Sequence, residues 1–172
     1  MWPNYWMSPE TNSINRLPML NIEHFETNSL DGTWRFQLLR SPSDQSRKKW
    51  TAIPVPGLWT MQPTSDTFFD KPIYTNVQMP WDHVAPDVPA ENPTGIYERD
   101  FEIPQSWNGK RIVLHLGGYE SVAVLFINGE EVGLTKDSRL AAEFDITSFI
   151  KHGRNTVRIS VCLLYTSDAA DD

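Results

Sequence analysis

Apolar and polar residues alternate along several short stretches of this chain. In residues 32–39, Trp34, Phe36 and Leu38 alternate with polar side chains, and residues 156–161 repeat the same spacing. Successive side chains of a β-strand point to opposite faces of its sheet. This period of two therefore predicts strands that bury one face and expose the other.

A second group of strands is predicted in the middle of the chain. Residues 97–103 alternate except at Arg99, which falls on the apolar side, and residues 111–116 place three apolar side chains on one face. The apolar run 122–127 leads directly into Asn128-Gly129. Because Asn-Gly favours positive φ at both positions of a two-residue turn, this run predicts one arm of a β-hairpin.

Two other stretches complete the expected secondary structure. Residues 53–57 contain two prolines and predict an extended edge, whereas residues 144–150 predict a short helical turn that ends at Gly153. Many short strands with almost no helix predict an all-β protein. The simplest architecture is an antiparallel β-sandwich of the jelly-roll type.

The chain divides into three parts by composition. Residues 1–30 are rich in Asn, Ser, Pro and Thr and predict an N-terminal arm, and residues 31–161 predict the jelly-roll domain. Residues 162–172 show neither alternation nor turn chemistry, so we expect a non-native, adaptor-like tail on a domain that is incomplete at its C-terminal end. A genuine disordered acidic tail is the alternative.

Length and charge narrow the class of protein. The 172 residues suffice for one domain, and a net charge of −7 argues against nucleic acid or an anionic membrane as partner. The start of the chain carries no signal-peptide pattern and Cys162 is the lone cysteine, which together favour a cytoplasmic protein. The four histidines are scattered without ligand spacing, so we expect no metal site.

A proline-rich connection between residues 71 and 97 is the best candidate for a binding loop. It contains Asn76, whose amide can both donate to and accept from a sugar hydroxyl, although Asn often bonds its own loop backbone. Tyr74 and Trp81 flank the loop. Their rings could stack on a pyranose, or they could simply pack against the protein.

Several motifs carry a resemblance to a known family. They are Thr75-Asn76-Val77, the block 91–97 (ENPTGIY), residues 30–36 (LDGTWRF) and Asp137-Ser138-Arg139. Together they resemble the amino-terminal, sugar-binding domain of bacterial β-galactosidases of glycoside hydrolase family 2. In Asp137-Ser138-Arg139 we expect an ion-pair network on a loop rim, and in Asn92-Pro93-Thr94-Gly95 we expect a structural turn with an unusual dihedral at the glycine.

The resemblance implies a galactose-binding-domain-like jelly roll whose Asn76 contacts the galactosyl group of a β-galactoside. It also implies retaining hydrolysis of terminal β-galactosides such as lactose, which requires two carboxylates about 5 Å apart. In this family both glutamates belong to a later barrel domain, so we expect no catalytic residue in this chain and no turnover by the chain alone. Mg²⁺ and Na⁺, bound mainly by the remaining domains, and a homo-oligomeric full-length enzyme are further implications.

Two other classes of function fit the same sequence. A stand-alone carbohydrate-binding module would share the jelly roll, and sequencing the gene beyond the Val161 codon would separate it from a glycosidase domain. A structural or assembly domain of another family 2 glycosidase, such as a β-glucuronidase or a β-mannosidase, would leave Asn76 without a ligand.

Overall fold

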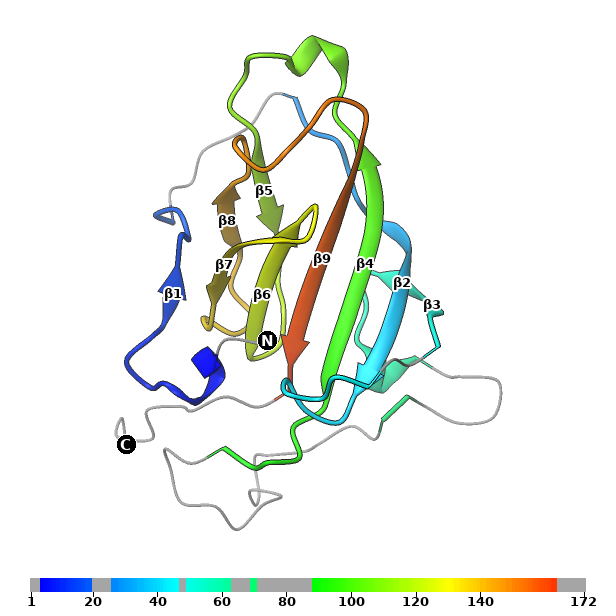
Figure 1. Cartoon of the computed structure of the whole chain (residues 1–172), viewed down its shortest axis with the longest axis vertical. Coiled ribbons are helices and arrows are strands. Elements are labelled where there is room, and N and C mark those ends of the chain that lie inside the picture. Colours follow the sequence, from blue (N-terminus) through cyan, green and yellow to red (C-terminus); the bar gives the residue numbers. More distant parts are fainter. Residues whose placement is uncertain (1–3, 20–25, 47–48, 63–68, 71–87, 164–172) are drawn as a thin grey trace.

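The computed structural model describes residues 4–19, 26–46, 49–62, 69–70 and 88–163 (Figure 1). Within these ranges the chain is all-β, with short 3-10 helices at η1 (Asn4–Met7), η2 (Trp59–Met61) and η3 (Gln105–Trp107). The all-β class predicted from the alternating pattern is therefore confirmed.

The strands form two antiparallel sheets. The larger has seven strands in the order β1-β7-β6-β9-β4-β2-β3, and the smaller pairs β5 with β8. The larger sheet consists of β1 (Ser13–Ile14), β2 (Gly32–Leu39), β3 (Thr51–Val55), β4 (Thr94–Glu102), β6 (Val122–Ile127), β7 (Glu130–Thr135) and β9 (Arg154–Cys162). The smaller sheet consists of β5 (Val113–Leu116) and β8 (Ala142–Asp145).

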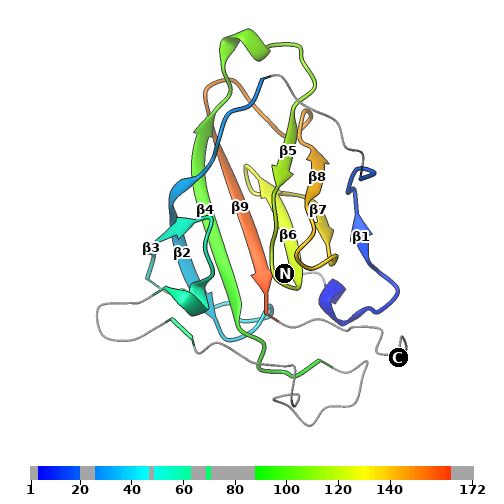
Figure 2. The ribbon, with the colours of Figure 1, turned by 180° about the vertical axis from the view of Figure 1, so that it is seen from behind.

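The two sheets face each other across one apolar core, as the predicted sandwich requires. Figure 2 shows β5 and β8 in front of one half of the larger sheet. The core joins Phe36 and Leu125 of the larger sheet to Leu114 and Phe144 of the smaller one, and all four side chains are buried. Burying a side chain of this size contributes about 1.5–3 kcal/mol.

The structure explains both Arg99, the exception to the alternation of residues 97–103, and the predicted turn at Asn128-Gly129. Arg99, on the apolar side of its strand, donates hydrogen bonds of 2.8 Å from Nη1 to the backbone oxygens of Leu30 and Asp31, so its charge meets carbonyl groups. Asn128 and Gly129 form the β6–β7 hairpin turn with φ of 54° and 87°. The hairpin prediction is confirmed.

The predicted helical turn over residues 144–150 is wrong at its start. Phe144 and Asp145 lie in β8, where Phe144 pairs with Leu114 across the small sheet. The turn begins after the strand, because Asp145 Oδ1 accepts hydrogen bonds from the backbone N–H (3.0 Å) and the hydroxyl (2.6 Å) of Thr147.

The two ends of the described chain contact the sandwich. Within the predicted arm, β1 pairs with β7, and the buried Lys136 ammonium donates to the backbone oxygen of Ser8. At the other end, Cys162 is the last residue of β9 and is buried. Residues 164–172 lie outside the described ranges, so the nature of the tail stays a prediction.

Candidate functional site

The predicted binding residues Asn76, Tyr74 and Trp81 lie in residues 71–87, outside the described part of the chain. Their roles therefore stay predictions. The structure does describe the residues that hold both ends of this segment.

The two ends are anchored on opposite faces of the larger sheet. Before the segment, Phe69 packs edge-on against Phe36 in the main core, with 4.9 Å between ring centroids. After it, Val88 packs against a second cluster that contains Val122 and Val124. These two valines alternate along β6 with Leu125, which belongs to the main core, so the two clusters lie on opposite faces.

Backbone contacts then return the chain to the sheet. The N–H of Asn92 donates to the oxygen of Arg40 (2.9 Å), and the hydroxyl of Thr94 donates to the oxygen of Asn92 (2.9 Å). Asn92 and Thr94 are fully buried. The expected structural role of this turn agrees with these contacts.

Glycine is required at position 95 for a different reason from the one expected. It is an ordinary strand residue of β4, paired with Leu38 and Val161, and does not have a positive φ. A Cβ at this position would lie 2.8 Å from Phe36 Cε2 and 3.0 Å from two ring carbons of Trp59. The glycine is needed for the close approach of aromatic rings, and the expected unusual dihedral is wrong.

Four aromatic side chains gather at this point. Phe36 is the centre, with Tyr97 at 4.9 Å and Trp59 at 6.2 Å between ring centroids, in addition to Phe69. Burial raises the pKa of the Tyr97 hydroxyl above its usual range. The cluster holds Phe69, which lies two residues before the segment that contains Asn76.

A large cavity opens beside this cluster. Its volume is about 1170 Å³, and its wall includes Trp34, Trp59, Tyr97, Leu114 and Val161. Pockets for small molecules usually measure about 300–1,000 Å³ and place a few polar groups among apolar ones. The cavity is therefore slightly larger than the usual range.

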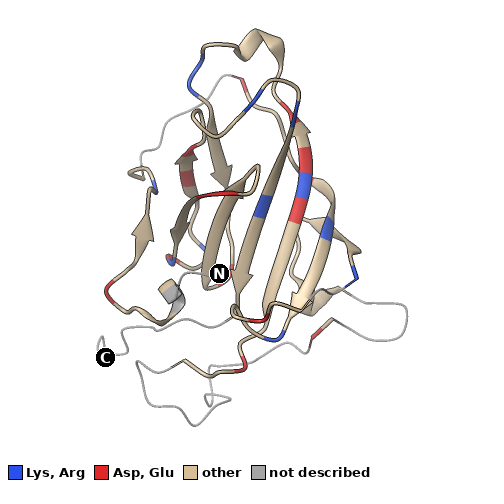
Figure 3. Ribbon diagram, in the orientation of Figure 1, with Lys and Arg blue, Asp and Glu red and all other residues tan. Residues whose placement is uncertain are grey.

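The carboxylates on the open face of β4 are held in ion pairs. Glu98 accepts hydrogen bonds from Arg35 and Arg158, and Asp100 accepts them from Arg35 and Arg154 (Figure 3). Hydrogen bonds from Arg35 and Arg154 hold the pKa of Asp100 well below its usual range. A general acid needs the opposite shift, so Asp100 fits a structural role.

The predicted network of Asp137 with Arg139 takes another form. Asp137 pairs with Arg16, whereas Arg139 pairs with Glu120 at 3.2 Å. Both residues make ion pairs on the loop, but with partners that are distant in sequence. The signal that sequence reasoning missed is Arg16, whose side chain is largely buried.

In the described ranges, no three side chains of His, Cys, Asp or Glu are grouped so that they could hold a metal ion. Cys162 is buried, and this burial raises the pKa of its thiol to about 12, which disfavours the thiolate. Among the helices of the described residues, none is long and apolar enough to cross a membrane.

Comparison with known families gives one match that spans most of the chain. Residues 27–171 match the model described as "Glycosyl hydrolases family 2, sugar binding domain".

Curated relatives share the same region. The chain is 41% identical over 154 residues to a β-galactosidase of Aeromonas hydrophila, covering 82% of the chain and 15% of the relative. It is 37% identical over 173 residues to a β-galactosidase of Kluyveromyces lactis, covering 92% and 16%. The chain thus spans about one sixth of the length of these relatives.

Solved structures show a similar fold. A β-glucuronidase of Ruminococcus gnavus in complex with uronic deoxynojirimycin matches 82% of this chain and 22% of that one, with a TM-score of 0.60 and 22% identity. A β-D-glucuronidase from Dictyoglomus thermophilum matches 78% and 19%, with a TM-score of 0.55 and 24% identity. At these identities the likeness concerns the fold alone.

Proposed function

The chain belongs to glycosyl hydrolase family 2, whose sugar-binding domain it carries, and from this premise we propose that it forms one wall of the substrate site of a β-galactosidase. One observation supports the choice of β-galactosides. The relatives named above, both β-galactosidases, are 37–41% identical to it over an aligned region that covers four fifths or more of the chain.

In this proposal the segment 71–87 supplies the contact with substrate. Asn76 hydrogen-bonds a hydroxyl of the galactosyl group through its amide, which both donates and accepts. Tyr74 and Trp81 are secondary candidates that present aromatic faces to the sugar. The anchors on both faces of the sheet, Phe69 and Val88, support the proposal because they fix the positions of the residues on either side of the segment.

The remaining chemistry is assigned to other domains of the full-length enzyme. Retaining hydrolysis of terminal β-galactosides such as lactose needs a nucleophile and an acid/base carboxylate, and we propose that neither comes from this chain. We propose that Mg²⁺ and Na⁺ are bound mainly by the remaining domains, as the family resemblance implies. We further propose that the full-length enzyme is a homo-oligomer in the cytoplasm.

Replacing Asn76 tests the substrate contact. We expect Asn76→Ala in the full-length enzyme to weaken galactose binding by about 0.5–1.5 kcal/mol, or roughly two- to tenfold, because one hydrogen bond is lost. Competitive inhibition by galactose gives the affinity.

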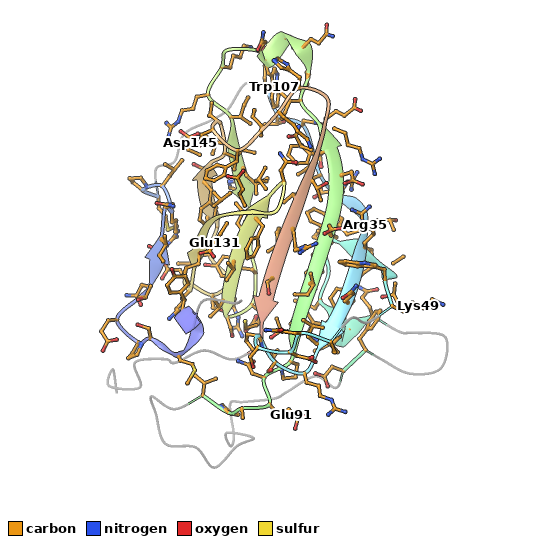
Figure 4. All side chains as sticks on the ribbon, in the orientation of Figure 1. Arg35, Lys49, Glu91, Trp107, Glu131 and Asp145 are labelled. Atoms are coloured by element: carbon orange, nitrogen blue, oxygen red, sulfur yellow. The ribbon has the colours of Figure 1, made fainter. Side chains whose placement is uncertain are left out.

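Asn108→Ala is the matched control. Asn108 is exposed and follows Trp107, which lies at the end of the sandwich opposite Glu91 (Figure 4). The galactose affinity of the Asn108→Ala enzyme should equal that of the unmodified enzyme. Equal galactose affinity for Asn76→Ala and Asn108→Ala would assign Asn76 to the loop structure and favour an assembly domain.

A further inference from the structure

The sequence contains two Asn-Gly pairs, Asn108-Gly109 and Asn128-Gly129. An asparagine before glycine can lose its side-chain amide without an enzyme, because glycine has no side chain to hinder the attack of its backbone nitrogen on the amide carbon. The two pairs share this local chemistry. A difference in their reactivity must therefore come from the structure around them.

The amide of Asn128 has a partner for each of its polar groups. Its Nδ2 donates to the backbone oxygen of Phe149 (2.8 Å) and to Oδ1 of Asn155 (2.9 Å), and its Oδ1 accepts from the N–H of Thr156 (3.1 Å). An amide has two N–H donors and one carbonyl acceptor, so this side chain is held at both ends. It cannot turn toward Gly129 without breaking these hydrogen bonds.

The amide of Asn108 is not held in this way. Asn108 directly follows η3, at the end of the sandwich where Figure 4 labels Trp107. Its side chain is exposed and makes no hydrogen bond within the part of the chain that the structure describes. It can therefore turn toward the next residue without losing a bond.

The backbone around Asn108 is also accessible. Asn108 has φ −59° and ψ 129° and Gly109 has φ 75°, which is the geometry of a type II β-turn, closed by a bond from the N–H of Lys110 to the oxygen of Trp107 (3.0 Å). A Cβ at Gly109 would meet nothing within 4 Å, so the turn has space for the backbone rotation that ring closure requires. The N–H of Gly109 has no backbone partner in the described ranges, so hydroxide can remove its proton.

We propose that Asn108 is a site of spontaneous deamidation and that its hydrogen bonds protect Asn128 from the same reaction. The backbone nitrogen of Gly109 attacks Cγ of Asn108 and forms an N–Cγ bond. The Cγ–Nδ2 bond breaks, and the amide nitrogen leaves as ammonia after it takes up a proton. Water then opens the cyclic imide at either carbonyl carbon, which leaves aspartate or isoaspartate at position 108.

The test compares the two sites in one sample. The folded chain is kept at mildly alkaline pH, and trypsin separates the two sites because it cuts after Lys110 and Arg111. Mass spectrometry of the two peptides at intervals gives the rate of conversion at each site. Because Asn128 must first give up its hydrogen bonds, we expect Asn108 to convert at least about tenfold faster.

The same measurement in denaturant is the matched control. Unfolding removes the hydrogen bonds of Asn128, so the two Asn-Gly pairs should then convert within about threefold of each other. Asn108→Gln identifies the reacting residue, because its longer side chain cannot close the same ring. In the folded variant we expect this peptide to stay unconverted over the time in which the unmodified chain reacts.

Four results would overturn the proposal. They are equal rates at the two sites of the folded chain, faster conversion of Asn128, a preference for Asn108 that persists in denaturant, and no conversion of Asn108 in the folded chain while the denatured chain reacts. None of them bears on the galactose affinity of Asn76→Ala, which tests the proposed function separately.

Discussion

The missing side chain at Gly95 lets two aromatic residues, Phe36 and Trp59, pack against β4. Phe36 approaches β4 so closely that a Cβ on Gly95 would lie 2.8 Å from its ring, and Trp59 packs against the same spot. Real carbon atoms in contact lie about 3.5–4.0 Å apart. Any larger residue must therefore displace a ring that is part of the core.

We predict that Gly95→Ala lowers the free energy of unfolding by about 1–3 kcal/mol, the usual cost of overpacking a core. Thermal or denaturant unfolding of the purified chain measures it. Gly117→Ala is the matched control, since a Cβ at Gly117 would meet nothing within 4 Å. Equal stability of the two variants would show that the aromatic cluster accommodates the added methyl group without a loss of stability.

For individual residues, the local sequence indicates which positions matter more reliably than it indicates why they matter. The block around Asn92 and Gly95 could be recognised as structural, but the conformation predicted for Gly95 was wrong, because the need for glycine arises from Phe36 and Trp59, which are distant in sequence. Asn76 could be selected only by its motif and its proline-rich setting. Its surroundings depend on tertiary structure that no local pattern contains.

Ion pairs connect three adjacent strands on the open face of the larger sheet. Arg35 of β2 contacts Glu98 and Asp100 of β4, and Arg154 and Arg158 of β9 contact the same two carboxylates (Figures 3 and 4). Side chains directly across strands stabilise a sheet when their charges are opposite. The hydroxyl of Thr156 donates a further bond of 2.7 Å to Asp100.

This network makes stability depend on pH. Because the pKa of Asp100 is lowered in the folded protein, its contribution is complete above the unfolded value of about 3.9 and is lost as pH falls through the folded value. We predict that Asp100→Asn lowers the free energy of unfolding by about 1–3 kcal/mol at neutral pH, and that the difference shrinks below pH 4.

Denaturant unfolding at several pH values measures the difference. Glu102→Gln is the control, since Glu102 lies on the same strand, is exposed and makes no side-chain bond in the described ranges. A difference for Asp100→Asn that does not change with pH would contradict a titrating network.

Strands could be predicted where apolar and polar residues alternate over a long stretch of the sequence. The eight residues of β2 and the nine of β9 carry clear patterns, and the Asn-Gly turn located the β6–β7 hairpin. In contrast, β1 has two residues and β8 has four, too few to establish a period of two. Their strand structure comes from pairing with β7 and β5, which are distant in sequence.

At the scale of the molecule, the count of short strands predicted a sandwich, and the structure has one. The unequal width of its sheets was not predictable, because it depends on which strands pair across the core. This inequality leaves the cavity whose wall includes Leu114 of β5. The sugar contact is proposed for the segment with Asn76.

The most direct test of the whole account is substrate preference. The full-length enzyme and this chain alone would be assayed with a chromogenic β-galactoside and with the matching β-glucuronide. The account predicts that the full-length enzyme has the higher kcat/KM for the galactoside and that the chain alone turns over neither substrate. A preference for the glucuronide, or inhibitor-sensitive hydrolysis by the purified chain, would contradict it.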